Sequence, residues 1–101
     1  MGTLARDRPV AAACAESLKA LAHPVRLRVV AALCDAEQTV IGLSKSLAVP
    51  QAIVSQQLRI LRMAGLVSAK RAGGFAVYSI AKPGLRNLVT CIERCHKGGK
   101  K

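Results

Sequence analysis

Residues 49–67, VPQAIVSQQLRILRMAGLV, constrain the fold more than any other segment. Pro50 precedes a run of helical periodicity and Gly65 follows it as a candidate C-terminal cap. With about 100° per residue and Gln51 at zero, apolar side chains occupy the sector between about 180° and 300°. The opposite sector is polar, contains no acid, and consists chiefly of Gln51, Ser55, Gln56, Arg59 and Arg62. We therefore predict one amphipathic helix from Gln51 to about Ala64, with one face for a core and one for a partner.

The distribution of charge indicates the nature of that partner. The formal net charge is +11, from 16 Lys and Arg against 5 Asp and Glu. No acid occurs between Glu37 and Glu93, although this window contains several lysines and arginines and includes the helix described above. A solvated surface usually mixes both signs, so an acid-free half favours binding to a polyanion.

Periodicity along the chain predicts the elements around this helix. Helical spacing recurs at about 10–22, 24–34, 41–47 and 83–96. The runs LVSAKR and FAVYSI, separated by AGG, predict a two-stranded hairpin. We therefore expect a mainly α fold with a small β-hairpin, and a single domain spanning 1–101 with loose basic tails at about 1–8 and 97–101.

This order of elements predicts a winged helix-turn-helix, whose second helix enters the major groove of DNA. The predicted DNA-contacting residues are Gln51, Ser55, Gln56, Arg59, Arg62, Lys70 and Arg71. Glutamine can bond adenine through two hydrogen bonds, and serine can bond a base or a phosphate. The helix arginines suit phosphates, with Arg59 also suited to guanine, and the hairpin cations suit the DNA backbone or minor groove. Gln57 falls near 240°, so we predict a buried, hydrogen-bonded amide there.

Three segments, LKALAHPVRLRVVAAL, LAVPQAIVSQQLRILRMAGLV and KRAGGFAVYSI, resemble the ArsR/SmtB family of bacterial winged-helix repressors. The similarity runs from about residue 15 to residue 80. It implies a homodimer joined through its first and last helices and bound to a palindromic operator. It also implies release of the DNA by an inducer, with no cofactor required for DNA binding.

The resemblance assigns base contacts to Gln51, Ser55 and Gln56, the residues that the helical periodicity places on the polar face. Two positions that are often serine in the family are Pro50 and Ala52 here. One or two of the family's usual DNA contacts are therefore in question, although the fold is not.

Cysteine is the candidate chemistry for sensing the inducer. Cys91 and Cys95 are four residues apart on the last predicted helix, so they share a face with Cβ atoms about 5–6 Å apart. The resemblance places Cys14, on the first helix, beside the last helix in the dimer. Three thiolates suit As(III) or Sb(III), and a fourth ligand such as His96 would suit zinc or cadmium. Small apolar fillers of an interface are the alternative interpretation of Cys91 and Cys95.

A redox mechanism is an alternative to metal sensing. Relatives that sense persulfide or oxidants pair a second-helix cysteine with one near the end of the last helix. Cys34 and Cys95 are the candidates here, although Cys34 comes about one turn late and Cys95 about two residues early. A plain buried thiol is the other interpretation of Cys34. His23, beside the helix break at Pro24, is interpreted as structural.

Other classes of protein agree less well with the sequence. No nucleophile–histidine–acid set, carboxylate pair or phosphate loop indicates an enzyme. No apolar run approaches the roughly 18 residues of a membrane span, and no secretory signal is evident, so we expect a cytoplasmic protein with reduced cysteines. A non-specific architectural DNA-binding protein would explain the charge. It would explain neither the cysteines nor the base-facing polar face.

Overall fold

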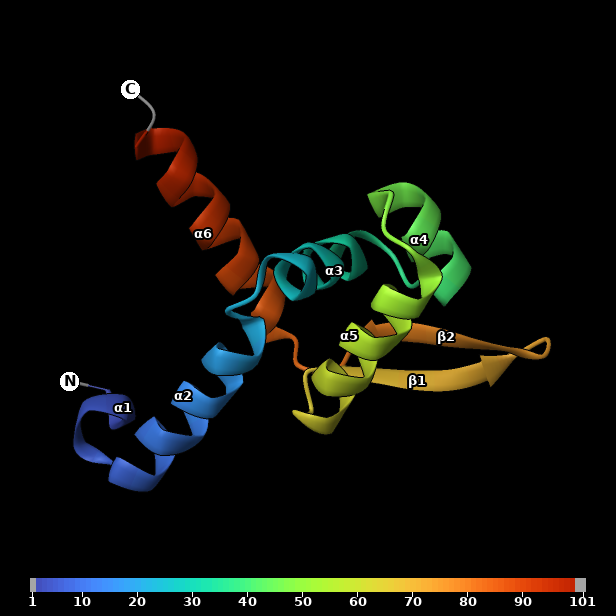
Figure 1. Ribbon diagram of the computed structural model, residues 1–101. Helices are drawn as coiled ribbons and strands as arrows, with labels where there is room; N and C mark the ends of the chain where they lie inside the picture. The colour runs from blue at the N-terminus through green and yellow to red at the C-terminus, as the bar shows by residue number, and fades with distance from the viewer. Residues whose placement is uncertain (1, 100–101) are drawn as a thin grey trace.

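The computed structural model describes residues 2–99, with side chains described as far as His96. The helices are α1 (Thr3–Arg6), α2 (Arg8–Leu21), α3 (Pro24–Asp35), α4 (Val40–Leu47), α5 (Gln51–Met63) and α6 (Gly84–Gly99). The strands are β1 (Val67–Ala72) and β2 (Phe75–Ile80). Figure 1 shows α3, α4, α5 and the hairpin as one body, from which α2 and α6 extend as two diverging arms. This arrangement confirms the predicted winged helix-turn-helix.

The core is aliphatic, as the scarcity of aromatic residues requires. Its fully buried side chains are Val29, Val30, Leu33, Leu43, Val54, Leu58, Leu61 and Leu66. They come from α3, α4, α5 and the start of the hairpin, so these elements fix one another's positions. Only Leu21 of α2 is buried, and none of the helices within residues 2–99 has the length and apolarity needed to cross a membrane.

The ends of the chain differ from the prediction. The first eight residues, predicted to be a loose tail, contain α1 and the first residue of α2. The Asp7 carboxylate caps α2 by accepting the N–H of Val10 at 3.1 Å, and Pro9 occupies the first turn, where its missing N–H is not needed. At the other end α6 continues to Gly99, beyond the predicted limit, and residues 100–101 lie outside the described part of the chain.

A compact turn joins α4 to α5. The Ser44 hydroxyl donates to the Val49 carbonyl at 2.6 Å, and the Val49 N–H donates to the Ser44 carbonyl at 3.1 Å. Ala48 lies in the left-handed region, with a φ of 56°. The Arg28 guanidinium donates to the Leu47 carbonyl at 2.7 Å and satisfies one of the free carbonyls at the end of α4. These contacts fix the angle at which α5 leaves the turn.

His23 has the structural role that the sequence predicts. It precedes α3, and its Nδ1 accepts the N–H groups of Val25 and Arg26 at 3.1 and 3.5 Å. Pro24 is the first residue of that helix, where its ring fits the backbone. The break between α2 and α3 is therefore set by a side-chain cap.

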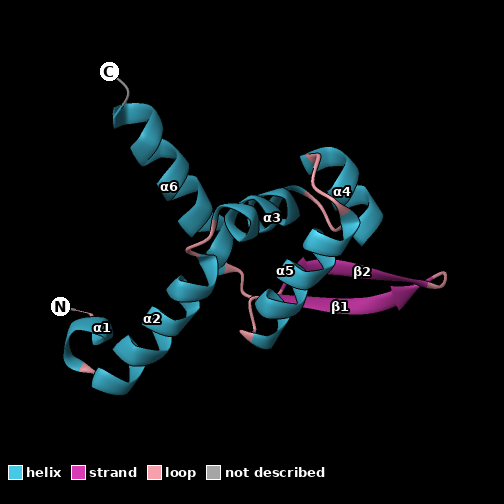
Figure 2. Cartoon of the chain, in the orientation of Figure 1, coloured by secondary structure: helices cyan, strands magenta, loops and turns pink. Residues whose placement is uncertain are grey.

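The hairpin is held to the loop before α4 by a contact that the sequence did not reveal. Gly73 and Gly74, with φ values of 57° and 86°, form the predicted two-residue turn. Gln38, in the loop between α3 and α4, exchanges two backbone hydrogen bonds with Tyr78 at 3.1 and 2.8 Å. Figure 2 shows the two long strands projecting beside α5. The loop before α4 therefore anchors the hairpin of β1 and β2, which we call the wing.

Candidate nucleic-acid interface

The polar face of α5 lies on the outside of the body. The helix buries Val54, Leu58 and Leu61 against the core. All five of its predicted DNA-contacting residues are exposed, and we call Gln51, Ser55, Gln56, Arg59 and Arg62 the recognition face. The groove along this face is lined by Ala52, Ser55, Gln56, Arg59, Arg62, Met63 and Tyr78. The fold therefore presents the predicted set together, on one accessible surface.

Both ends of α5 suit this role. At its C-terminus, Gly65 has a φ of 77°, its N–H donates to the Arg62 carbonyl, and the Leu66 N–H donates to the Leu61 carbonyl, each at 3.0 Å. This pattern confirms the predicted glycine stop and returns the chain to the core at Leu66. At its N-terminus, Pro50 supplies no side-chain cap, and the first turn contains no acid. The free N–H groups and positive end of the helix dipole there suit a phosphate.

The buried side of α5 is rotated from its predicted position. The three buried residues lie between about 280° and 340° rather than around 240°. Ile53 and Ile60, predicted to be inward, are 38% and 37% exposed, because the body packs on only one side of the helix and Ile60 faces a shallow hollow beside α2. Gln57 is half-buried, but its Oε1 accepts no hydrogen bond from any described residue. The prediction of a hydrogen-bonded amide was therefore wrong.

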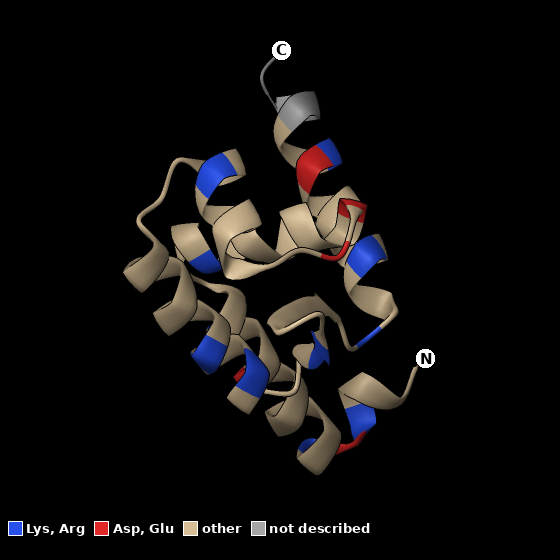
Figure 3. Ribbon diagram, turned by 90° about the vertical axis from the view of Figure 1, so that its right-hand side faces the viewer, with Lys and Arg blue, Asp and Glu red and all other residues tan. Residues whose placement is uncertain are grey.

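Lys70 and Arg71 extend the basic surface onto the wing. Both are exposed on β1, and the Arg71 guanidinium donates to the Gly74 carbonyl at 3.1 Å, which holds it at the hairpin tip. Neither α5 nor the hairpin contains an acid. Figure 3, viewed from the wing end, shows that blue Lys and Arg segments predominate over red acidic ones on this side. Among the described side chains, the only ion pair joins Lys19 to Glu16 on α2. The cations of α5 and the wing thus remain available to an external anion.

Tyr78 and Met63 also line the groove, although neither belongs to the predicted set of DNA-contacting residues. Met63 is 80% exposed at the end of α5. Tyr78 belongs to β2 and reaches the groove only because the hairpin packs beside α5. No local pattern could have found Tyr78, since its position depends on a contact between distant segments.

The structure does not bring all three predicted metal ligands together within one chain, although Cys91 and Cys95 lie on the same helix. Cys14 on α2 and both Cys91 and Cys95 on α6 are exposed, and none is in a disulfide. The two helices diverge from the body. In the part of the chain described, no three His, Cys, Asp or Glu side chains form a group that could hold a metal ion. A site with three thiolates would therefore need a helix from a second copy.

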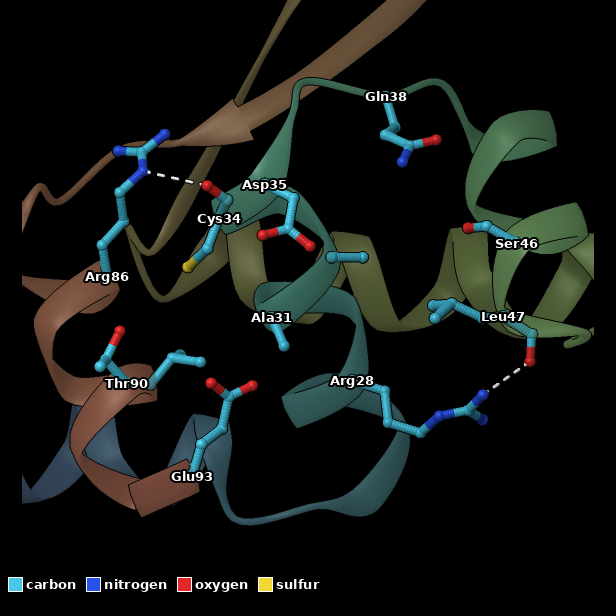
Figure 4. Close-up of a pocket in the computed structure, with 12 residues that line it drawn as sticks. Arg28, Ala31, Cys34, Asp35, Gln38, Ser46, Leu47, Arg86, Thr90 and Glu93 are labelled. Atoms are coloured by element: carbon cyan, nitrogen blue, oxygen red, sulfur yellow. Dashed lines mark hydrogen bonds between the residues drawn. The ribbon is translucent and has the colours of Figure 1, made fainter. Parts of the chain in front are cut away.

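Cys34 lies in a different environment, at the end of α3. It lines a cavity of about 560 Å³ between α3, α4 and α6, which Asp35 and Glu93 also line, Glu93 from α6 (Figure 4). Burial raises the pKa of the Cys34 thiol, and the two carboxylates raise it further, whereas Arg86 lowers it. The raised pKa keeps the thiol protonated and weakens it as a nucleophile. Cys34 and Cys95 are both free, and Cys95 does not line this cavity.

The sequence and the fold both match known bacterial regulators. A family model described as "Bacterial regulatory protein, arsR family" matches residues 23–69, which run from the cap of α3 into β1. The uncharacterized HTH-type transcriptional regulator Rv0081 of Mycobacterium tuberculosis is 39% identical over 81 residues. These residues cover 79% of this chain and 71% of that protein.

Two solved structures extend the comparison to most of the chain. The transcriptional repressor BigR from Xylella fastidiosa is 31% identical with a TM-score of 0.84, covering 93% of this chain and 96% of that one. The homodimeric winged helix-turn-helix domain of Mb0332 from Mycobacterium bovis is 28% identical with a TM-score of 0.78, covering 90% and 86%. With these matches and the basic winged helix-turn-helix described above, the chain belongs to the ArsR family of DNA-binding transcriptional regulators.

Proposed function

We propose that the protein is a homodimeric transcriptional repressor that binds a palindromic operator and is released by an inducer sensed through cysteine thiols. The observation that carries DNA binding is the recognition face, which is exposed, acid-free and continuous with the basic wing. Two copies related by a twofold axis would place two such faces on successive major-groove segments of a palindrome. In this proposal DNA binding requires no cofactor.

Exposed apolar residues on the two arms support a second copy as the partner. Val10, Cys14 and Leu18 recur at four-residue intervals on α2, and Val10 and Leu18 are 37% and 52% exposed. On α6, Leu88 and Ile92 are only half-buried. A small body cannot cover these rows itself, whereas a dimer built from α2 and α6 would bury them. The homodimeric state of Mb0332 agrees with this arrangement.

The cysteines suit a soft metal ion as the inducer, As(III) or Sb(III) before others. Cys91 and Cys95 lie one turn apart on α6, and Cys14 belongs to the exposed row of α2. In the proposed dimer the partner's α2 would supply the third thiolate, and thiolates are the ligands that soft ions prefer. Zinc or cadmium would need a fourth ligand, for which His96 is the nearest candidate in sequence.

Release from DNA requires a difference in affinity, not merely binding. The inducer must bind the arrangement that is incompetent for DNA more tightly than the competent one. For a full switch this ratio is about 10⁴-fold, or about 5.5 kcal/mol. Thiols on α2 of one copy and α6 of the other would supply this difference in affinity, because closing the metal site would change the angle between the two copies.

The test is release of labelled operator from reduced protein, followed by fluorescence anisotropy during titration with As(III), Cd(II) or a persulfide donor. The Cys91→Ser, Cys95→Ser double variant should bind operator normally and no longer be released. Cys14→Ser should also lose the metal response, whereas Cys34→Ser, the matched control, should keep it. Normal release of the double variant by every inducer would place the sensing site elsewhere.

The same variants test the redox alternative. A Cys34–Cys95 bridge predicts the reverse pattern, in which Cys34→Ser abolishes release by the oxidant or persulfide and Cys14→Ser leaves it intact. The raised pKa of Cys34 favours the metal mechanism, because a protonated thiol attacks slowly.

A further inference from the structure

Tyr78 occupies an unusual position for an aromatic residue in so small a protein. The two aromatic residues, Phe75 and Tyr78, both lie on β2, and neither is fully buried. Tyr78 packs at the margin of the core and lines the groove beside Ser55, Gln56 and Arg59. Its hydroxyl forms no hydrogen bond with any described residue. A phenol with a packed ring and a free hydroxyl usually meets a polar partner.

The strand register places Tyr78 between the recognition face and the wing tip. Tyr78 pairs with Ala69, and Arg71 pairs with Ala76. Because side chains alternate along a strand and paired residues share a face, these four lie on one side of the hairpin. Tyr78 and Arg71 are therefore about 7 Å apart along the strand direction, and the other two side chains of this group are the small ones of Ala69 and Ala76. This side of the hairpin is therefore shallow, with a polar group at each end.

Resting on the function proposed above, we propose that the Tyr78 hydroxyl donates a hydrogen bond to a phosphate of the operator. A duplex that contacts both the recognition face and Arg71 must pass over this side of the hairpin. The small side chains of Ala69 and Ala76 let the DNA backbone approach closely. The hydroxyl is the hydrogen-bond donor on that path, and phosphate oxygens are the acceptors that a passing backbone offers.

The backbone of Tyr78 is held in place before any DNA arrives. Its N–H and carbonyl both bond to Gln38, at 2.8 and 3.1 Å. The contact therefore positions the wing relative to α5 rather than recognising a base. It should strengthen binding to all DNA sequences alike, and, because tyrosine is neutral, it should release no counterion.

The experiment compares Tyr78→Phe, which removes only the hydroxyl, with Ser79→Ala. Ser79 is the matched control, since its hydroxyl lies on the other side of the same strand, 3.3 Å from that of Ser68. Affinity is measured by fluorescence anisotropy on a palindromic duplex that the wild-type protein selects from a random pool. A scrambled duplex of equal length serves as non-specific DNA. Thermal melting of each variant establishes that the ring still packs.

Tyr78→Phe should weaken binding about 3- to 10-fold on both duplexes, the effect of one neutral hydrogen bond. Ser79→Ala should stay within about 2-fold of wild type. The slope of log affinity against log salt should be unchanged for Tyr78→Phe, whereas Arg71→Ala should reduce it by about 0.9.

Three results would overturn the assignment. Unchanged affinity of Tyr78→Phe would remove the contact, and a loss confined to the selected duplex would make Tyr78 a base contact. A reduced salt slope in Tyr78→Phe would show a rearranged wing. If instead the wild-type protein selects no duplex at all, the proposed function fails before Tyr78 is tested.

Discussion

Replacing Ala48 by glycine should stabilise the protein, although glycine normally weakens a helix. Ala48 ends α4 with φ and ψ of 56° and 46°, in the left-handed region. There the Cβ of an L-residue crowds the following carbonyl oxygen, at a cost of about 1–2 kcal/mol. Glycine removes this strain but gives the unfolded chain more freedom, which offsets about 0.4–1 kcal/mol. Ala48 is exposed, so no packing is lost, and the net gain should be about 0.5–1 kcal/mol.

DNA binding should not change in this variant. The turn is held by Ser44 and Val49 through their backbone groups and the serine hydroxyl, and the methyl group of Ala48 takes no part in these bonds. The angle between α4 and α5 should therefore be preserved. Affinity for the selected palindromic duplex should remain within about twofold of wild type. This change is much smaller than the loss of affinity expected when a hydrogen bond at the upper end of the usual range is removed.

The assay is urea denaturation and thermal melting at equal protein concentration, since a dimer's melting temperature depends on concentration. The expected rise in melting temperature is about 2–6 °C for a domain of this size. Ala12→Gly is the matched control: it makes the same chemical change at an exposed position inside α2, where it should cost about 1 kcal/mol. If both variants lost stability equally, the left-handed strain at Ala48 would be refuted.

Three further outcomes are expected. Gln56→Ala should cost about 1–3 kcal/mol on the selected duplex and little on scrambled DNA, and equal losses would remove Gln56 from base recognition. Leu88→Glu should give monomers by light scattering and abolish operator binding, whereas a persistent dimer would place the interface elsewhere. Burial raises the pKa of the Cys34 thiol, so the folded protein favours the protonated form. The stability that the thiol contributes in this way is complete below pH 9.0 and is lost as the pH rises further. Urea titrations from about pH 8 to 10 should therefore show a shallower decline for Cys34→Ala; an identical decline would contradict this.

Local patterns were sufficient to predict most of the fold. The limits of α5 follow from Pro50 before it and Gly65 after it, and the hairpin follows from two β-rich runs around Gly73 and Gly74. The recognition face could be predicted because its members belong to one helix, where spacing alone decides which side chains lie together. Each of these features depends on residues fewer than about 16 apart.

Contacts between distant segments could not be predicted in this way. The bonds between Gln38 and Tyr78 join a loop to a strand forty residues away, and no periodicity marks either partner. The rotation of α5 has the same origin, because α3 and α4 decide which of its sides is covered and leave Ile53 and Ile60 exposed. Helical spacing identifies an apolar side, but the neighbours of the helix decide how much of it is buried.

In the proposed mechanism, the path from inducer sensing to DNA binding would run through α3. α6 packs on α3, and Arg86 of α6 donates to the Cys34 carbonyl at the end of α3 at 3.2 Å. Arg28, nearer the other end of α3, donates to the Leu47 carbonyl at the turn that sets the angle of α5. A shift of α6 would therefore reach α5 through one rigid helix fastened at both ends. In that mechanism a ligand on the cysteines of α6 would shift α6, and α3 would pass the shift to the recognition face. An inducer bound only within the wing would have no such connection to the dimer, which is why the thiols on the arms are the stronger candidates for the sensor.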